Sequence, residues 1–331
     1  GSLVLSGYSP GAPPRSAYGD LVIGVYDAAG ESVDWEIVDG VPDEAPTGDP
    51  TGWRGGISAA GDDVGTFTSV VGDGANVHVT YFDRTNGALK FATGTPGGEW
   101  STHTVDDDGF AGEYSSLTLA SGGPAVSYLG ITAPAMLPGR PVSEVRVATA
   151  SGVPSGPTDW TITDVVTAEI DCRPELCPEG STCLESGECV MPSSDCTEEC
   201  ADDTACVMGS CEAALPEDFI EDLAPAVGLF TSMAPTSGGL ALVYYDRAQG
   251  NLMGVEFDGS AWGEPFLIDG YGVGDPDIGD SGLSATLAVD AAGVWHVAYV
   301  DGAEETLRYA RIEGGTATTE IVDDGSTDGT D

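Results

Sequence analysis

The sequence predicts an all-β protein, a β-propeller of four-stranded antiparallel blades with a small disulfide-rich insertion. A segment of Tyr, an apolar residue and Asp recurs along the chain, and a recurrence near 50 residues is typical of propellers and solenoids. Short runs rich in Val, Thr, Tyr and Phe, bounded by Gly, Asp and Pro, indicate strands. No window carries a helical period. We expect five blades; six blades and a solenoid are the alternatives.

The recurring segment defines the blades. Its copies are 47 to 56 residues apart, except for one interval of 116 residues that contains all the cysteines. The third copy ends in Gly instead of Asp. The five copies are Val25–Asp27, Tyr81–Asp83, Tyr128–Gly130, Tyr244–Asp246 and Tyr299–Asp301.

Each later blade should contain four strands in a fixed order. A first run of small residues, such as Thr66–Val71, suits the innermost position, where strands of all blades converge. The Tyr-bearing run comes second, and a run such as Leu89–Ala92 comes third. A fourth run follows a Trp in most copies.

The first blade is the least regular. We expect its inner strand at Leu3–Ser6, its second at Leu21–Asp27 and an outer one at Ser32–Asp39, with no clear third strand. Either this blade is degenerate or its N-terminal strand completes another blade.

Composition and spacing divide the chain into four parts. We expect blades 1 to 3 in residues 1–169, the disulfide-rich insertion in 170–215, blades 4 and 5 in 216–325, and a polar tail in 326–331.

Eight cysteines form two tandem sets of four within 40 residues. No CxxC pair and no His occurs among them, which disfavours zinc. Disulfides are the expected state, and they indicate an oxidising compartment outside the cytoplasm. Connectivity is open at this point, and no apolar run reaches membrane length. The cysteines are Cys172, Cys177, Cys183, Cys189, Cys196, Cys200, Cys206 and Cys211.

The charge balance is extreme: 55 acidic residues face ten Lys and Arg, for a net charge of −45. Such a surface repels nucleic acid and anionic membranes, so both are excluded as partners, as is direct membrane insertion. The acidic coat can serve solubility or adaptation to salty surroundings, where counterions screen repulsion.

Clustered aspartates in two connections offer the oxygen ligands that Ca²⁺ takes, and calcium is the one cofactor that the sequence suggests. The alternative is that these are solvated turns, which select Asp and Gly in any case. The candidate ligands are Asp106, Asp107, Asp108, Asp275, Asp277 and Asp280.

The meander places the turns between second and third strands on the same face as the connections between blades. The long loop of residues 41–64 reaches that face and carries an aromatic beside a guanidinium, a usable contact for a sugar or a peptide. In the alternative, Trp53 fills a junction between blades. The ligand-binding candidates are Trp53, Arg54, Arg84, Arg247 and Tyr271.

Catalytic patterns are weak. The three histidines share no metal-binding spacing, and no nucleophile elbow, phosphate loop or dinucleotide fingerprint occurs. Glycoside hydrolysis needs two carboxylates about 5 to 10 Å apart, and 55 acids supply such pairs by chance. No catalytic residue is therefore predicted.

Two units, TYFDRTNGALKFAT and AYVDGAEETLRYAR, resemble the repeats of secreted bacterial β-propellers with a Tyr-Tyr-Asp and Leu-Lys-Tyr-Ala pattern. The resemblance covers four blades and, more weakly, the first. The cysteine insertion is similar to short tandem four-cysteine modules of bacterial surface proteins. Both resemblances imply an extracellular or surface role. The organisation of the repeated blades is also similar to that of sialidases. The Ser-x-Asp-x-Gly-x-Thr-Trp box of that superfamily, however, is not reproduced at Asp258–Trp262 or Pro96–Trp100.

Together these observations predict a secreted or surface-displayed, non-catalytic binding or assembly protein that uses its acidic loop face. Its partners would be a protein or glycan at the cell surface, or further copies of itself. A glycoside-processing enzyme with acidic catalytic residues and a structural subunit of a filament or coat are the alternatives.

Overall fold

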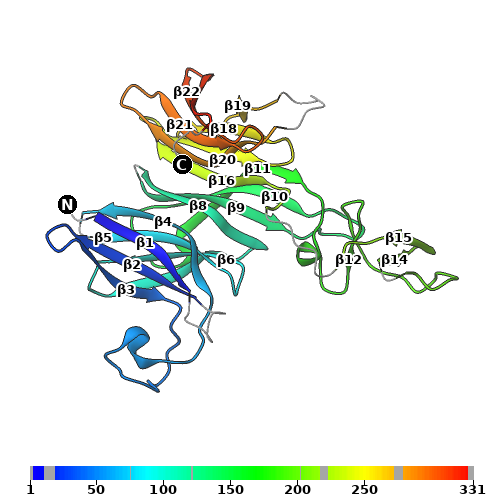
Figure 1. The fold of residues 1–331 in the computed structure, drawn as a ribbon, viewed down its shortest axis with the longest axis horizontal. Coiled ribbons are helices and arrows are strands. Elements are labelled where there is room, and N and C mark those ends of the chain that lie inside the picture. The colour runs from blue at the N-terminus through cyan, green and yellow to red at the C-terminus, as the bar shows by residue number, and fades with distance from the viewer. Residues whose placement is uncertain are drawn as a thin grey trace.

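The fold was analysed in a computed structural model, which describes residues 3–10, 19–74, 76–120, 122–201, 203–216, 223–271 and 279–326. Five antiparallel sheets follow one another along the chain, and two small hairpins lie between the third and the fourth (Figure 1). The described ranges contain no α-helix, only three short 3-10 turns. The predicted all-β propeller with four-stranded blades and a disulfide-rich insertion is therefore confirmed.

Blades 2 to 5 are complete meanders in which each strand pairs with the next in sequence. Blade 2 consists of β4 (Val64–Asp73), β5 (Asn76–Asp83), β6 (Ala88–Gly94) and β7 (Trp100–Asp106). Blade 3 consists of β8 (Phe110–Ala120), β9 (Gly123–Thr132), β10 (Val142–Ala150) and β11 (Trp160–Glu169). Blade 4 consists of β16 (Val227–Pro235), β17 (Leu240–Asp246), β18 (Asn251–Phe257) and β19 (Phe266–Asp269). Blade 5 consists of β20 (Ser281–Val289), β21 (Trp295–Asp301), β22 (Thr306–Glu313) and β23 (Thr316–Asp323).

Blade 1 has three strands: β1 (Leu3–Pro10), β2 (Gly19–Asp27) and β3 (Ser32–Asp39). The pairing of β2 with β3 skips one residue next to Leu21, which faces Asp39. The same skip separates third and fourth strands elsewhere, as at Leu89 opposite Asp106. β2 is therefore a third strand, β3 a fourth and β1 a second.

The prediction for blade 1 was wrong in this respect. We expected an inner strand at Leu3–Ser6 and a missing third strand, but the strand that is absent from the described sheet is the innermost one. Val25–Asp27 is not a copy of the Tyr-x-Asp segment; the equivalent residues are those at the end of β1. Tyr8 faces Leu21 as Phe82 faces Leu89, so Gly7 occupies the place of Tyr81.

Buried cores lie between neighbouring blades. One joins Leu21 and Ile23 of blade 1 to Val79 and Tyr81 of blade 2, and similar cores join blades 2 and 3, 3 and 4, and 4 and 5. The inner strands β4, β8, β16 and β20 contact one another in this order, β1 contacts β4, and no contact of similar extent joins β20 to β1 within the described residues. Burial between sheets drives this stacking, because each face is apolar and covered by the next blade.

A polar triad crosses three of the four blade boundaries. Asp106, at the end of a fourth strand, accepts a hydrogen bond from the Tyr128 hydroxyl at 2.8 Å and pairs with Arg146 at 2.9 Å. Two further triads have the same geometry: Asp39 with Tyr81 and Lys90, and Asp269 with Tyr299 and Arg308. These contacts explain why a Tyr of the second strand and a basic residue of the third recur directly opposite each other.

The boundary between blades 3 and 4 differs. The residue equivalent to the fourth-strand Asp is Val166, and Met253 replaces the basic residue. Both belong to the apolar core between these blades. Tyr244 is buried there, and its hydroxyl makes no hydrogen bond to another described residue. Acceptor and cation are thus lost together, which avoids an unpaired buried charge.

The insertion contains four disulfides and two hairpins, β12–β13 (Thr182–Cys183, Cys189–Val190) and β14–β15 (Thr204–Val207, Ser210–Ala213). Each four-cysteine set pairs its first cysteine with its third and its second with its fourth: Cys172–Cys183, Cys177–Cys189, Cys196–Cys206 and Cys200–Cys211. Gly139 and Cys189 exchange two backbone hydrogen bonds, which attach the first set to blade 3. The insertion extends from the side of that blade (Figure 1).

Candidate active site

The inner strands share a bulge near their start. A glycine with positive φ is followed two residues later by a second residue with positive φ: Phe67, Tyr114, Phe230 or Ser284. At this point the register of each inner strand shifts against its second strand. Bulges of this kind turn a side chain out of the regular pleat. Here they direct three aromatic rings of successive blades toward one another.

The three rings form a continuous row. The Tyr114 centroid lies 4.7 Å from that of Phe67 and 4.7 Å from that of Phe230. Such spacings are typical of attractive, tilted aromatic pairs. The row therefore joins the inner strands of blades 2, 3 and 4 with an apolar floor.

Glu113 precedes Tyr114 and is the chemically unusual member of its repeat position. The equivalent residues are Thr66, Leu229 and Leu283, none of which carries a charge. Glu113 is largely buried, and burial raises the pKa of its carboxyl to about 7, although Arg84 and Arg173 oppose the shift. A carboxyl with such a pKa is partly protonated at neutral pH.

Three of the nine arginines act on this region of a very acidic protein. Arg84 acts on Glu113, while Arg173 acts on both Glu113 and Tyr114. Arg247 acts on Tyr114, whose pKa burial raises to about 12. Arg84 and Arg247 begin equivalent turns after β5 and β17, and Arg173 follows the first cysteine of the insertion. The fold thus concentrates positive charge where Glu113 lies.

A second carboxylate belongs to the same region. Asp63 precedes β4, is buried, and its Oδ2 lies 3.7 Å from Arg84 Nη1. Its Oδ1 accepts hydrogen bonds from the Tyr8 hydroxyl at 2.7 Å and from the Gly19 amide at 3.2 Å. Arg84 therefore acts on Asp63 and Glu113 alike. Thr66, the blade 2 equivalent of Glu113, has a buried Oγ1 that has no hydrogen-bond partner among the described residues.

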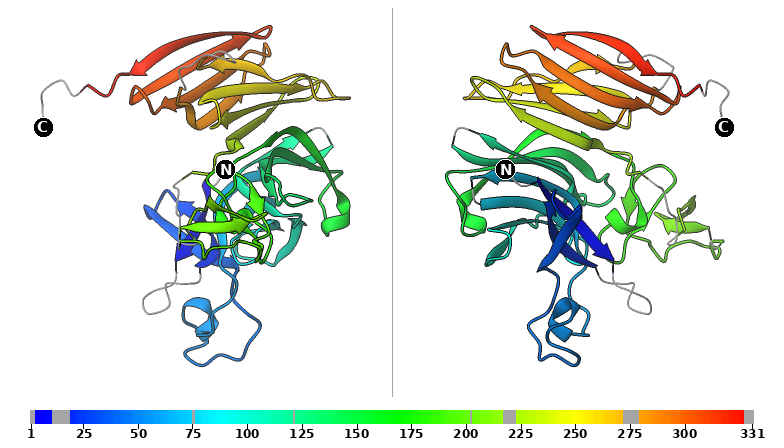
Figure 2. Two further views of the ribbon diagram at one scale, coloured as in Figure 1. Left: turned by 90° about the vertical axis from the view of Figure 1, so that its right-hand side faces the viewer. Right: turned by 60° about the vertical axis from the view of Figure 1, so that its left-hand side comes forward.

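The structure separates the predicted ligand-binding residues. Arg84 acts on Glu113 and Arg247 on Tyr114 of the inner strand β8, whereas Trp53 and Arg54 belong to the 3-10 turn Trp53–Gly56, on the loop that Figure 2 shows extending below blade 1. Arg54 pairs with buried Asp20 at 2.9 Å and donates to the Ala59 carbonyl at 3.0 Å, so it holds the loop in place. Tyr271 is exposed beside blade 4, and its amide donates to Asn251 Oδ1.

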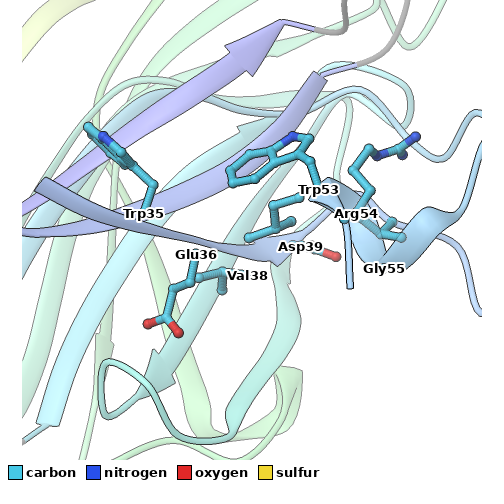
Figure 3. A pocket seen from close by; sticks show the side chains of 10 residues that line it. Trp35, Glu36, Val38, Asp39, Trp53, Arg54 and Gly55 are labelled. Atoms are coloured by element: carbon cyan, nitrogen blue, oxygen red, sulfur yellow. The ribbon is translucent and has the colours of Figure 1, made fainter. Parts of the chain in front are cut away.

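Trp53 lines a groove with a residue that sequence reasoning did not select, Trp35 of β3. Their side chains are 54% and 45% exposed, and both rings rise from the same side of β3, whereas Glu36 points to the other side (Figure 3). Arg54 also lines the groove. Two open indole faces beside polar groups are suited to stacking on sugar rings.

Trp35 had a recognisable signal in the repeat. Each Trp that starts a fourth strand contacts the preceding blade where one exists: Trp100 donates to Glu36 at 3.2 Å and Trp160 to His103 at 2.9 Å. Blade 1 has no preceding blade in the described structure. Its Trp35 is therefore left open to solvent.

The aspartates predicted as calcium ligands lie in different environments. Asp106 is buried in the triad with Arg146, while Asp107 and Asp108 are exposed. Asp280 accepts a hydrogen bond from the Tyr245 hydroxyl, and Asp275 and Asp277 lie outside the described residues. Within the described ranges, every group of three ligand atoms within 4.8 Å includes a disulfide-bonded cysteine. Calcium binding stays a prediction, and a comparison of melting temperatures in calcium and in EDTA is its direct measurement.

Comparisons with known proteins give no sequence family. No protein family description matches the sequence, and no curated protein matches it. In the described part of the chain, no helix is long and apolar enough to cross a membrane. The four disulfides indicate an extracellular protein.

Several solved structures align with the chain. A GH43 β-1,3-galactosidase is 10% identical over 78% of this chain and 75% of its own, with a TM-score of 0.40. An endo-1,4-β-xylanase from Bacteroides thetaiotaomicron is 12% identical over 98% and 94%, with a TM-score of 0.37. A xylan β-1,4-xylosidase from Bacillus halodurans is 12% identical over 96% and 53%, with a TM-score of 0.35.

These comparisons correct one expectation. The three solved structures named above are glycoside hydrolases, which contradicts the main hypothesis of a non-catalytic binding or assembly protein and favours its glycoside-processing alternative. Because the TM-scores are below 0.5, they assign neither residues nor substrate.

Proposed function

We propose that this protein is an extracellular glycoside-processing enzyme in which Glu113 is the acid that protonates the leaving oxygen. The observation that carries the proposal is a carboxyl with a pKa of about 7 on an innermost strand. Glycosidases need such an acid, because a carboxyl of ordinary pKa is almost fully ionised at neutral pH.

Asp63 is the candidate for the second carboxylate. Arg84 lies 3.7 Å from its Oδ2 and also acts on Glu113, so one cation connects the two acids. In hydrolysis Glu113 would give its proton to the glycosidic oxygen. The second carboxylate would either take a proton from the attacking water or attack the sugar carbon itself.

The groove of Trp35 and Trp53 supports a carbohydrate substrate. Exposed indoles away from the reacting groups can hold sugar units by stacking while Glu113 acts on a distant bond. We place the enzyme outside the cytoplasm, secreted or on the outer cell surface, since four disulfides require oxidising surroundings.

The test is a panel of aryl glycosides and oligosaccharides with the wild type, Glu113→Gln and the exposed control Glu99→Gln. Glu113→Gln should lose roughly 100-fold or more in kcat, while the control keeps its activity. Wild-type activity should fall as pH rises above about 7, because the acid loses its proton there. Absence of hydrolysis across the panel by wild type, or full activity of Glu113→Gln, would overturn the proposal.

A further inference from the structure

The segments that lead into and out of the disulfide-rich insertion are built into the core next to the aromatic row. Ile170, where the chain enters the insertion, and Ala226, where it leaves, are buried in one apolar cluster. Leu223 packs against this cluster, and so do Tyr114 and Phe230 of the row. The insertion is therefore joined to the core that supports the aromatic row as well as to the side of blade 3.

Two arginines hold these segments together. Arg173 of the entering segment donates a hydrogen bond to the carbonyl of Leu223 in the leaving segment. Arg247, from the turn after β17, donates to the same carbonyl, and its amide donates to the Ala226 carbonyl at 3.1 Å. The Leu223 carbonyl thus connects both ends of the insertion to blade 4.

The backbone before Arg173 is fixed by a disulfide. Cys172 is only 3% exposed and is bridged to Cys183, which is equally buried. The Cys172 amide donates to the Gly187 carbonyl at 2.9 Å. Arg173 therefore follows directly after a point at which the chain is held by a covalent bond and a hydrogen bond.

The backbone after Arg173 is fixed in a similar way. The Arg173 carbonyl accepts a hydrogen bond from the Leu176 amide at 3.0 Å in a 3-10 turn, and the next residue, Cys177, is bridged to Cys189. Cys189 exchanges backbone hydrogen bonds with Gly139 of blade 3. Both bridges of the first four-cysteine set thus restrain the chain on either side of Arg173.

Glu113 is the group on which Arg173 acts. Both Arg84 and Arg173 favour the ionised carboxylate and oppose the effect of burial. The Arg84 side chain is 60% exposed, so water and salt screen its effect, whereas the Arg173 side chain is 13% exposed. The charged and titratable groups described around Glu113 are Arg84 with its partner Asp63, Arg173 with its partner Glu175, and Tyr114 with Arg247.

We propose that the first four-cysteine set is part of the active site, because its two bridges fix Arg173 as a positioning residue that acts on Glu113. This inference rests on the proposed role of Glu113 as the acid. A group that tunes a catalytic side chain has to be held in place by its surroundings. The second four-cysteine set is attached to the first at Leu184 and Ala214 and does not share this role.

The test measures the pKa of the Glu113 carboxyl by carbon NMR in protein with labelled glutamate side chains, where Glu113→Gln assigns the signal. Arg173→Gln should raise this pKa by about 0.5 unit, because the lost cation favours the ionised form. Arg173→Lys keeps the charge and should shift it less. The matched control is Arg311→Gln, which removes one charge from the surface of blade 5 and should leave the pKa unchanged.

The disulfides are tested in the same way. Replacing Cys172 and Cys183 by Ser should raise the pKa of Glu113 as Arg173→Gln does, whereas replacing Cys200 and Cys211 by Ser should not. In an active enzyme, Arg173→Gln should also increase the ratio of kcat at pH 8 to kcat at pH 6 roughly two- to threefold, because the acid keeps its proton to higher pH. A merely structural role of Arg173 would lower kcat equally at both pH values.

An unchanged pKa of Glu113 in Arg173→Gln, or an equal shift in Arg311→Gln, would overturn the inference whether or not the protein is active. An equal shift after loss of either disulfide set would overturn the special role of the first set. A shift in Arg173→Gln in a protein that hydrolyses no glycoside would support the link between Arg173 and Glu113 and would overturn only the proposed function.

Discussion

The Tyr128 hydroxyl donates to Asp106 Oδ2 at 2.8 Å across the boundary between blades 2 and 3. Tyr128 is fully buried, and burial together with the neighbouring Asp106 holds its pKa well above the ordinary value. The hydroxyl therefore stays protonated and always serves as the donor, which makes it a fixed link between blades.

Replacing Tyr128 by Phe should cost about 1.5 to 3 kcal/mol of unfolding free energy, because a buried acceptor with a charge loses its donor. The matched control is Tyr244→Phe, at the boundary where Val166 replaces the aspartate, and it should cost less than about 0.5 kcal/mol. Urea denaturation measures both. Equal losses would show that the triad adds no stability beyond packing.

The raised pKa of the Glu113 carboxyl predicts that the stability of the protein depends on pH. Its folded pKa is raised from 4.5 to about 7, so the folded state holds the proton more tightly than the unfolded chain. The stabilisation is fully present below pH 4.5 and is lost as pH rises through about 7. Glu113→Gln, which never ionises, should match wild type at pH 4, below the unfolded pKa of 4.5, and exceed it by about 3 kcal/mol at pH 8. Denaturation at the two pH values measures the difference, and identical pH slopes would contradict the raised pKa.

The two disulfide sets should differ in what they stabilise. Cys189 exchanges hydrogen bonds with Gly139 of blade 3, while the second set reaches the first through Leu184 and Ala214. Loss of one bridge costs about 2 to 4 kcal/mol locally. Replacing Cys177 and Cys189 by Ser should speed hydrogen exchange in residues 132–141, whereas replacing Cys200 and Cys211 should leave that loop unchanged. Hydrogen exchange of the two variants, followed by mass spectrometry, measures this difference.

Trp53 should contribute to substrate binding without affecting the chemical step. Trp53→Ala should weaken oligosaccharide binding by about 1 kcal/mol, roughly fivefold, with kcat unchanged. Its 54% exposure means that stability should change little. The control is Met136→Ala, an exposed apolar residue outside the groove. A fall in kcat with unchanged KM would contradict a role in stacking.

Much of the fold could be predicted from the sequence because the repeat is strict. A bulged apolar residue followed by Asp ends four of the fourth strands, at Asp39, Asp106, Asp269 and Asp323. The error in blade 1 arose because Val25–Asp27 imitates the second-strand signature. Asp39 was the more reliable marker, since its spacing from Leu21 identifies β2 as a third strand.

The candidate site was beyond the reach of the sequence. Glu113 is one of 55 acidic residues, and its one mark in the sequence is that it stands where the other inner strands carry Thr66, Leu229 and Leu283. Its pKa depends on burial and on Arg84 and Arg173, which are distant in sequence and converge only in the fold. Trp53 could be selected because a long loop presents it, whereas Trp35 is accessible only because no blade precedes its own.

The apolar boundary of Val166 and Met253 has a mechanical consequence. At this boundary hydrogen bonds join the inner strands, such as Met233 N to Ser116 Oγ at 3.0 Å, whereas the other three boundaries are held in addition by a directional triad at the end of the fourth strand. We expect the arc of blades to flex at this boundary between blades 3 and 4. The boundary, which lies in the middle of the molecule, would then largely determine the distance between the first and the last blade.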